Sequence, residues 1–177
     1  MHAETELALR RNKGRALQAA FLMELERALE RTVDAGELTP IESTDRLIDR
    51  LRSSWTLARD TGAFDTATAI VETVNELRDA AEMWERRYPP REVYLLRQES
   101  EFCGALKIVS TEVLQHLPSL LTLDGEDVLA CSQEGDYGIT CQWTSPRWNR
   151  TDHELFEFFC WGAKSNAATP DGAGSSG

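Results

Sequence analysis

Apolar side chains recur three and four residues apart along the first ninety residues, the spacing of helices that bury one face. The first predicted helix spans residues 4–34 and ends before Gly36. The second starts at Thr39-Pro40-Ile41-Glu42, which combines a capping-box Thr and Glu with Pro at the first helical position, and runs to Thr61-Gly62.

A third helix is predicted to begin at Asp65 as N-cap and to carry a coiled-coil-like stripe over residues 67–84. The stripe comprises Ala67, Ile70, Val74, Leu77, Ala81 and Trp84. Tyr88-Pro89-Pro90 ends this helix, because Pro disfavours helical geometry in the residue before it. We expect the Pro pair to separate two regions, and we treat residues 67–84 as a candidate homodimer surface.

Beyond Pro90 the pattern shortens, and residues 92–96 are predicted to form a strand. Residues 100–117 fit a helix closed by Pro118, although Gly104 weakens it and residues 105–109 also fit a buried strand. The length and even spacing of the apolar positions favour the helix.

The remaining pattern predicts an antiparallel meander. Asp124-Gly125 suits a tight turn between strands at 121–123 and 127–131, and a second turn within 134–138 leads into a strand at 139–143. Residues 155–161 form the most aromatic segment and are predicted to lie inside the sheet, covered on both faces.

The fold class predicted is therefore α+β. A helical region of about three antiparallel helices occupies residues 1–90, and a β-α-β-β-β unit with a mainly antiparallel sheet occupies residues 91–162. Residues 163–177 contain scarcely any large apolar group, so we expect a flexible tail there.

Charge then narrows the classes of partner. The 177 residues carry a net charge of −11, which opposes binding to nucleic-acid phosphates. Residues 1–90 hold 13 Lys and Arg against 17 Asp and Glu (−4), and residues 91–177 hold 6 against 13 (−7). The N-terminus is polar and no apolar run is long enough for a membrane helix, so we expect a cytoplasmic protein that contacts neither membrane nor nucleic acid.

Few residues in the sequence are candidates for catalysis. His153 lies between Asp152 and Glu154, whose carboxylates would favour a protonated imidazole and allow acid–base work, but a polar loop explains these residues as well. His116 falls inside a predicted helix without acidic neighbours. We therefore expect no cofactor and no metal. The alternative to a binding protein is an enzyme that uses His153 with a carboxylate such as Asp152 or Glu154, with or without a cysteine thiol.

The four cysteines are Cys103, Cys131, Cys141 and Cys160, and their spacings match no zinc or redox motif. A loop centred on Asp136 would pair Cys131 with Cys141 across a hairpin, whereas a two-residue turn would pair Cys131 with Thr140. Either register predicts buried, reduced thiols in a reducing compartment.

Two surface features indicate partner binding. Carboxylates gather on the two predicted turns, and an aromatic loop carries arginines, the residue types enriched at interface hot spots. The candidate contacts are Asp124, Glu126, Asp127, Glu134, Asp136, Trp143, Arg147 and Trp148. The leading hypothesis is a non-enzymatic accessory protein that occludes a partner with a basic surface, such as an immunity protein, an antitoxin or a phage-encoded inhibitor of a defence system. A helical oligomerisation protein is a third hypothesis.

Overall fold

The fold is built on one six-stranded antiparallel sheet in the order β1-β6-β5-β4-β2-β3. The computed structural model describes residues 2–123, 127–144 and 155–164. The strands are β1 (Phe64–Val71), β2 (Glu92–Leu96), β3 (Leu106–Val109), β4 (Val128–Cys131), β5 (Tyr137–Trp143) and β6 (Phe156–Ala163). The predicted α+β class is confirmed.

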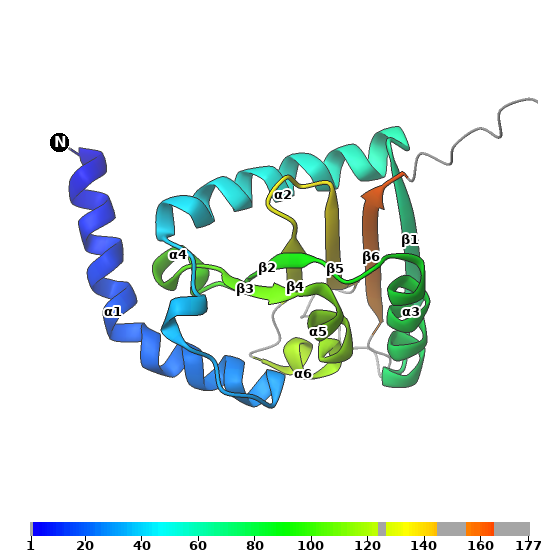
Figure 1. Ribbon diagram of the computed structural model, residues 1–177, viewed down its shortest axis with the longest axis horizontal. Coiled ribbons are helices and arrows are strands. Elements are labelled where there is room, and N and C mark those ends of the chain that lie inside the picture. Colours follow the sequence, from blue (N-terminus) through cyan, green and yellow to red (C-terminus); the bar gives the residue numbers. More distant parts are fainter. Residues whose placement is uncertain (1, 124–126, 145–154, 165–177) are drawn as a thin grey trace, which may run out of the picture.

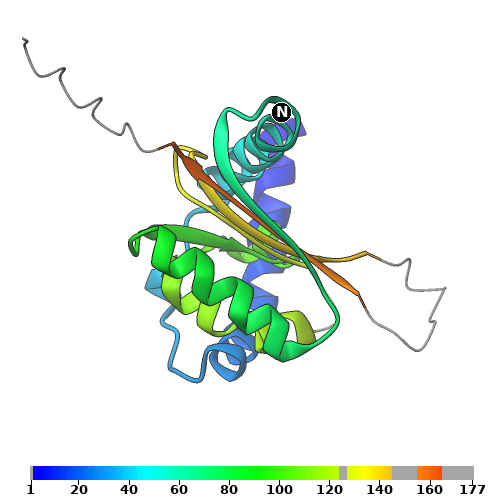
Figure 2. The same cartoon turned by 90° about the vertical axis from the view of Figure 1, so that its right-hand side faces the viewer.

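Helices cover both faces of this sheet. They are α1 (His2–Leu29), α2 (Ile41–Thr61), α3 (Val74–Arg87), α4 (Ser100–Cys103), α5 (Ser110–Gln115) and α6 (Leu117–Thr122), with a short 3-10 turn at Ala35–Glu37. Figure 2 shows the sheet nearly edge-on, with α2 on one side and α3, α5 and α6 on the other. The first half of α1 projects beyond the sheet, at the end of the molecule opposite β1 (Figure 1).

Alternate strand residues feed two separate apolar clusters. Val93, Leu95, Ile139 and Phe158 point to the face covered by α3, α5, α6 and the second half of α1. The strand residues next to these in sequence point to the opposite face of the sheet, which α2 covers. There Phe159 and Trp161 pack with Leu47 and Leu51. Because β6 is buried on both faces between β1 and β5, its predicted position inside the sheet is confirmed.

The predicted third helix is wrong over its first half. Residues 64–71 form β1, which pairs with β6, and the helix starts only at Val74. Its N-cap is Thr73, whose hydroxyl accepts from Glu76 N while the Glu76 carboxylate accepts from Thr73 N. The region 1–90 is therefore not purely helical, and its helices lie on opposite faces of the sheet, not in one bundle.

The long helix predicted over 100–117 is also wrong. This segment contains α4, β3 and α5, so the alternative of a strand at 105–109 was the better one. Gly104 stands between α4 and β3 with φ +95° and approaches the Thr39 backbone, so a side chain there would clash. Residues 121 and 122 belong to α6, so the strand predicted at 121–123 is not formed. Asp124-Gly125, the turn predicted to follow it, lies outside the described residues.

The start of α2 uses Thr39 differently from the predicted capping box. No side-chain hydrogen bond caps this helix, because the Thr39 hydroxyl accepts from Ala105 N at 3.1 Å and bonds to Thr44 Oγ1 at 2.8 Å. The predicted end of the helix is confirmed, with Gly62 in the left-handed conformation at φ +62°.

Candidate protein-binding surface

The turn between β4 and β5, residues 132–136, carries two of the predicted contact residues, Glu134 and Asp136. Ser132 Oγ donates to Asp136 Oδ1 at 2.6 Å and accepts from Tyr137 N at 3.1 Å. The Ser132 amide donates to Tyr137 O, and Gly135 N donates to Ser132 O. The turn is thus fixed by its own hydrogen bonds while Glu134 remains exposed.

Two other elements hold the same turn. Trp161 Nε1, from β6, donates to Gly135 O at 3.0 Å, and Arg50, from α2, donates to Gln133 O and pairs with Glu134. Gly135 has φ +74°, and a Cβ there would lie 2.4 Å from Ser54 Oγ, so any other residue would be strained at this position. Figure 1 shows this turn, in yellow, against α2.

A small pocket opens beside the turn, between α2 and the middle of β2. It has a volume of about 170 Å³ and combines cationic, hydroxyl, aromatic and amide groups with apolar walls. The lining residues are Thr39, Pro40, Ser43, Arg46, Leu47, Arg50, Tyr94 and Gln133. Pockets for whole small molecules are typically about 300–1,000 Å³, so this one suits a single side chain better.

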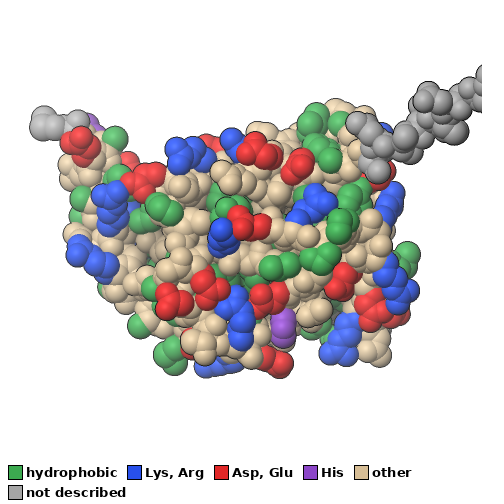
Figure 3. Space-filling model, in the orientation of Figure 1, with side chains coloured by type: hydrophobic (Ala, Val, Ile, Leu, Met, Phe, Trp, Pro, Cys, Tyr) green, Lys and Arg blue, Asp and Glu red, His purple; other side chains and the backbone are tan. Residues whose placement is uncertain are grey.

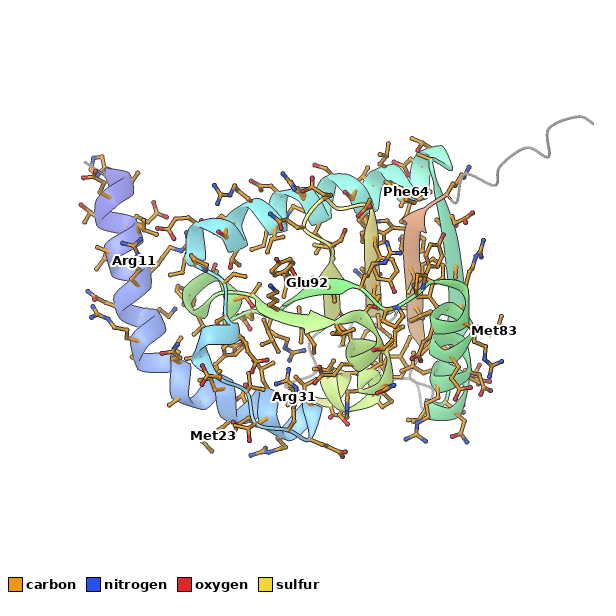
Figure 4. The ribbon with its side chains drawn as sticks, in the orientation of Figure 1. Arg11, Met23, Arg31, Phe64, Met83 and Glu92 are labelled. Carbon is orange, nitrogen blue, oxygen red and sulfur yellow. The ribbon has the colours of Figure 1, made fainter. Side chains whose placement is uncertain are left out.

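The Tyr94 hydroxyl at this pocket takes part in a set of polar contacts across the pair of strands β2 and β3. It donates to Glu92 Oε1 at 2.9 Å, and Lys107 Nζ lies 2.8 Å from Glu92 Oε2. The hydrogen bond from Lys107, followed by that from Tyr94, lowers the pKa of Glu92, and burial is the main cause that raises the pKa of Tyr94. Glu92 therefore stays ionised and orients the phenol. Figure 4 marks Glu92 on β2.

The other described contact residues lie at the opposite end of β4. Asp127 precedes the strand, and its Oδ1 accepts from Trp143 N at 3.4 Å. The Trp143 ring packs on Phe156 with centroids 4.2 Å apart, and its indole Nε1 is buried without a partner among the described residues. The structure thus brings Glu134 together with Asp136 and Asp127 together with Trp143, as two surfaces. Asp124, Glu126, Arg147 and Trp148 lie outside the described residues.

The thiols are poorly suited to nucleophilic chemistry. Burial raises the pKa of Cys131 and of Cys141 to about 12, raises that of Cys160 well above its usual value, and also raises that of Cys103. Neither predicted hairpin register is correct, since Cys131 faces Gly138 and Cys141 faces Val128. The two thiols lie on opposite faces of the sheet, and all four cysteines are free.

No acid–base centre is evident in the described part of the chain. His116 is half-buried between α5 and α6, and its carbonyl accepts from Leu120 N. His153, Asp152 and Glu154 lie outside the described residues. Among the residues that are described, no three His, Cys, Asp or Glu side chains gather as metal ligands would.

Sequence reasoning missed the pocket beside the turn. Arg46 and Arg50 are four residues apart on α2, a spacing that places them on one helical face, but no local pattern indicates what that face contacts. The sequence around Tyr94 predicts a strand and does not indicate that its side chain lines a pocket. Only the docking of the turn onto α2 makes these residues neighbours.

Charge is mixed across the surface. On the face seen in Figure 3, acidic and basic side chains are interspersed. Many of the basic side chains are held in ion pairs, such as Arg10 with Asp45 and Arg59 with Glu157. The excess negative charge is therefore carried by carboxylates outside these ion pairs.

Comparison with known proteins places the chain in no family. No family model, no curated protein and no solved structure matched it. No helix in the described ranges combines the length and apolar character needed to cross a bilayer.

Proposed function

We propose that this chain is a non-enzymatic accessory protein of the cytoplasm that binds another protein and acts by occluding a surface of it. Small immunity proteins, antitoxins and phage-encoded inhibitors act in this way. The binding surface we assign is the β4–β5 turn with the pocket beside it.

The rigidity of that turn carries the proposal. A recognition loop that is already fixed loses little conformational entropy on binding, which favours affinity. The turn is anchored by its own Ser132 and by two other elements, through Arg50 of α2 and Trp161 of β6. Such anchoring around an exposed carboxylate suits recognition more than it suits a loop that only connects two strands.

The pocket adds a place for one partner side chain. Its Arg46 and Ser43 groups favour an acidic or amide side chain, and Glu134 and Asp136 on the adjoining turn favour a basic one. A partner surface with mixed charge, basic where it faces the turn, would satisfy both.

Neutralising the turn tests the proposal. The variant Glu134→Gln with Asp136→Asn removes two charges and keeps hydrogen-bonding groups of the same shape. At about 0.5–1 kcal/mol for each charge at the rim of an interface, binding should weaken by about five- to thirty-fold. A partner captured from the native host would be purified and titrated by calorimetry against both proteins.

The control is Glu4→Gln with Asp79→Asn, which makes the same change in net charge at exposed positions on α1 and α3. It should bind as the wild type does. Equal affinities for all three proteins would refute the assignment of the turn. Capture of no partner, together with turnover that His153→Ala abolishes, would favour the enzyme alternative.

A further inference from the structure

The outer edge of β1 is open. β1 pairs with β6 through eight consecutive residues, from Phe64 opposite Ala163 to Val71 opposite Phe156, with no bulge. No strand among the described residues pairs with its other edge. A long regular edge presents backbone N–H and C=O groups that another strand can take up.

The opposite edge of the sheet is protected in ways that β1 is not. β3 has only four residues, carries Lys107, and is bridged by Leu38 from the loop before α2. Residues 66–71 of β1 contain neither a charge nor a proline, the two devices that commonly block edge pairing. The free edge of β1 is therefore competent for pairing.

Exposed apolar side chains flank this edge. Ile70 is 66% exposed, Val74, three residues beyond the strand, is 50% exposed, and Met83 on α3 is 70% exposed. Figure 4 places Met83 on the outer flank of α3, at the β1 end of the molecule. A strand added to β1 would bring a second set of such groups against these.

The charges beside the edge allow a second copy of this chain to occupy it. Two chains that each carry −11 can associate only where like charges are absent or neutralised. Residues 66–71 are uncharged, and the neighbouring Asp65 lies 3.4 Å from Arg87 and accepts from the Tyr88 hydroxyl at 2.9 Å. On α3, Glu82 pairs with Arg86.

We propose that a second copy of this chain pairs with β1 through its own β1, antiparallel, to form a twofold-symmetric dimer with one continuous sheet. In antiparallel pairing, hydrogen-bonded and non-hydrogen-bonded pairs alternate, so a twofold axis requires one residue to face its own copy. Centring on Ala67 or Thr68 pairs nearly the whole strand. Thr66, Thr68 and Ile70 of both copies then share the α2 face. The dimer is independent of the proposed function.

Sedimentation equilibrium of the full chain at several protein concentrations tests the dimer. The wild type should approach twice its monomer mass of 19.9 kDa. Thr68→Lys should raise the dissociation constant by about tenfold or more, because like charges meet across the axis. Val109→Lys makes the same kind of change on β3, where the side chain is 45% exposed, and should leave the dimer intact.

Met83→Glu, which leaves β1 unaltered, should weaken the dimer as well and covers the case in which Thr68→Lys impairs folding. Because the interface is uncharged and the chains repel each other, added salt should strengthen the dimer. A wild type that stays monomeric, or a dimer that both Thr68→Lys and Met83→Glu leave unchanged, would overturn the proposal.

Discussion

At the scale of single residues, the pair of Arg10 and Asp45 fastens α1 to α2. Arg10 donates two hydrogen bonds to the Asp45 carboxylate, at 2.7 and 2.9 Å, and two to Glu101 O. The hydrogen bond from Arg10 lowers the pKa of Asp45 below its ordinary value. One guanidinium thus joins α1 to both α2 and α4.

Asp45→Asn should lower the free energy of unfolding by about 0.5–1 kcal/mol at neutral pH, a modest value because the Asp45 side chain is 46% exposed. A carboxyl whose pKa is lower in the folded state contributes stability above its unfolded pKa of about 4 and loses it as the pH falls through the folded pKa. The difference between variant and wild type should therefore fade in acid. Urea unfolding of both at neutral and acid pH measures it.

Asp49→Asn, one turn later on α2 and exposed, is the matched control and should change stability little at either pH. If Asp45→Asn still lowers the free energy of unfolding at a pH below both pKa values, the loss comes from the altered geometry of the contact and not from its charge.

Thiol accessibility gives a second prediction at this scale. Cys131, Cys141 and Cys160 are fully buried, Cys103 is partly exposed, and burial raises the pKa of each. In the native protein a thiol reagent should therefore react with Cys103 at most, and in denaturant with all four thiols. Rapid native labelling of Cys131 or Cys141, followed by mass spectrometry, would contradict the burial described here.

At the scale of elements, the capping box of α3 is the device that starts this helix after β1. Thr73→Ala removes the oxygen that accepts from Glu76 N and should destabilise the protein by about 1 kcal/mol. Thr56→Ala, in the exposed interior of α2, should be neutral or slightly stabilising because Ala favours helix. Thermal unfolding compares the two, and equal losses for both would argue against the cap.

The error over residues 65–73 shows where sequence reasoning fails at this scale. Ala67, Ile70 and Val74 fit a helical stripe, yet the exposure along β1 alternates as a strand requires. What decides between them is pairing with β6, about ninety residues away, which no local pattern reveals. Thr73-Val74-Asn75-Glu76 did hold a capping-box signal inside the predicted helix, and it marks the true start.

The strands at 92–96, 128–131 and 137–143 were predictable because turn residues bound them and their own residues favour strands. In the candidate site, the turn at Glu134 and Asp136 was also predictable from Gly135. The pocket was not, since Arg46, Tyr94 and Gln133 come from three elements that meet only in the folded chain. Local pattern locates turns and strands, whereas surfaces made from distant elements need the fold.

At the scale of the whole molecule, the sheet crosses the boundary predicted at Pro90. β1 comes from the first ninety residues and the other five strands from the remainder. Helices from the first ninety residues also cover strands from the remainder. α2 packs on Phe159 and Trp161 on one face of the sheet, and α3 places Trp84 against the other face. Trp84 Nε1 donates to the Tyr137 hydroxyl at 2.9 Å across the same boundary, inside the core.

A core shared in this way predicts a single cooperative unit. The full chain should unfold in one transition that is coincident by far-ultraviolet circular dichroism and by tryptophan fluorescence. A fragment of residues 91–164 should fail to fold, because β6 would lose β1 and both sheet faces would expose large apolar side chains without α1, α2 and α3. Dispersed amide signals and cooperative unfolding from that fragment would instead establish it as a domain. Restoring residues 1–90 in trans should recover some folded protein, since the missing strand and helices lie in one continuous piece of the chain.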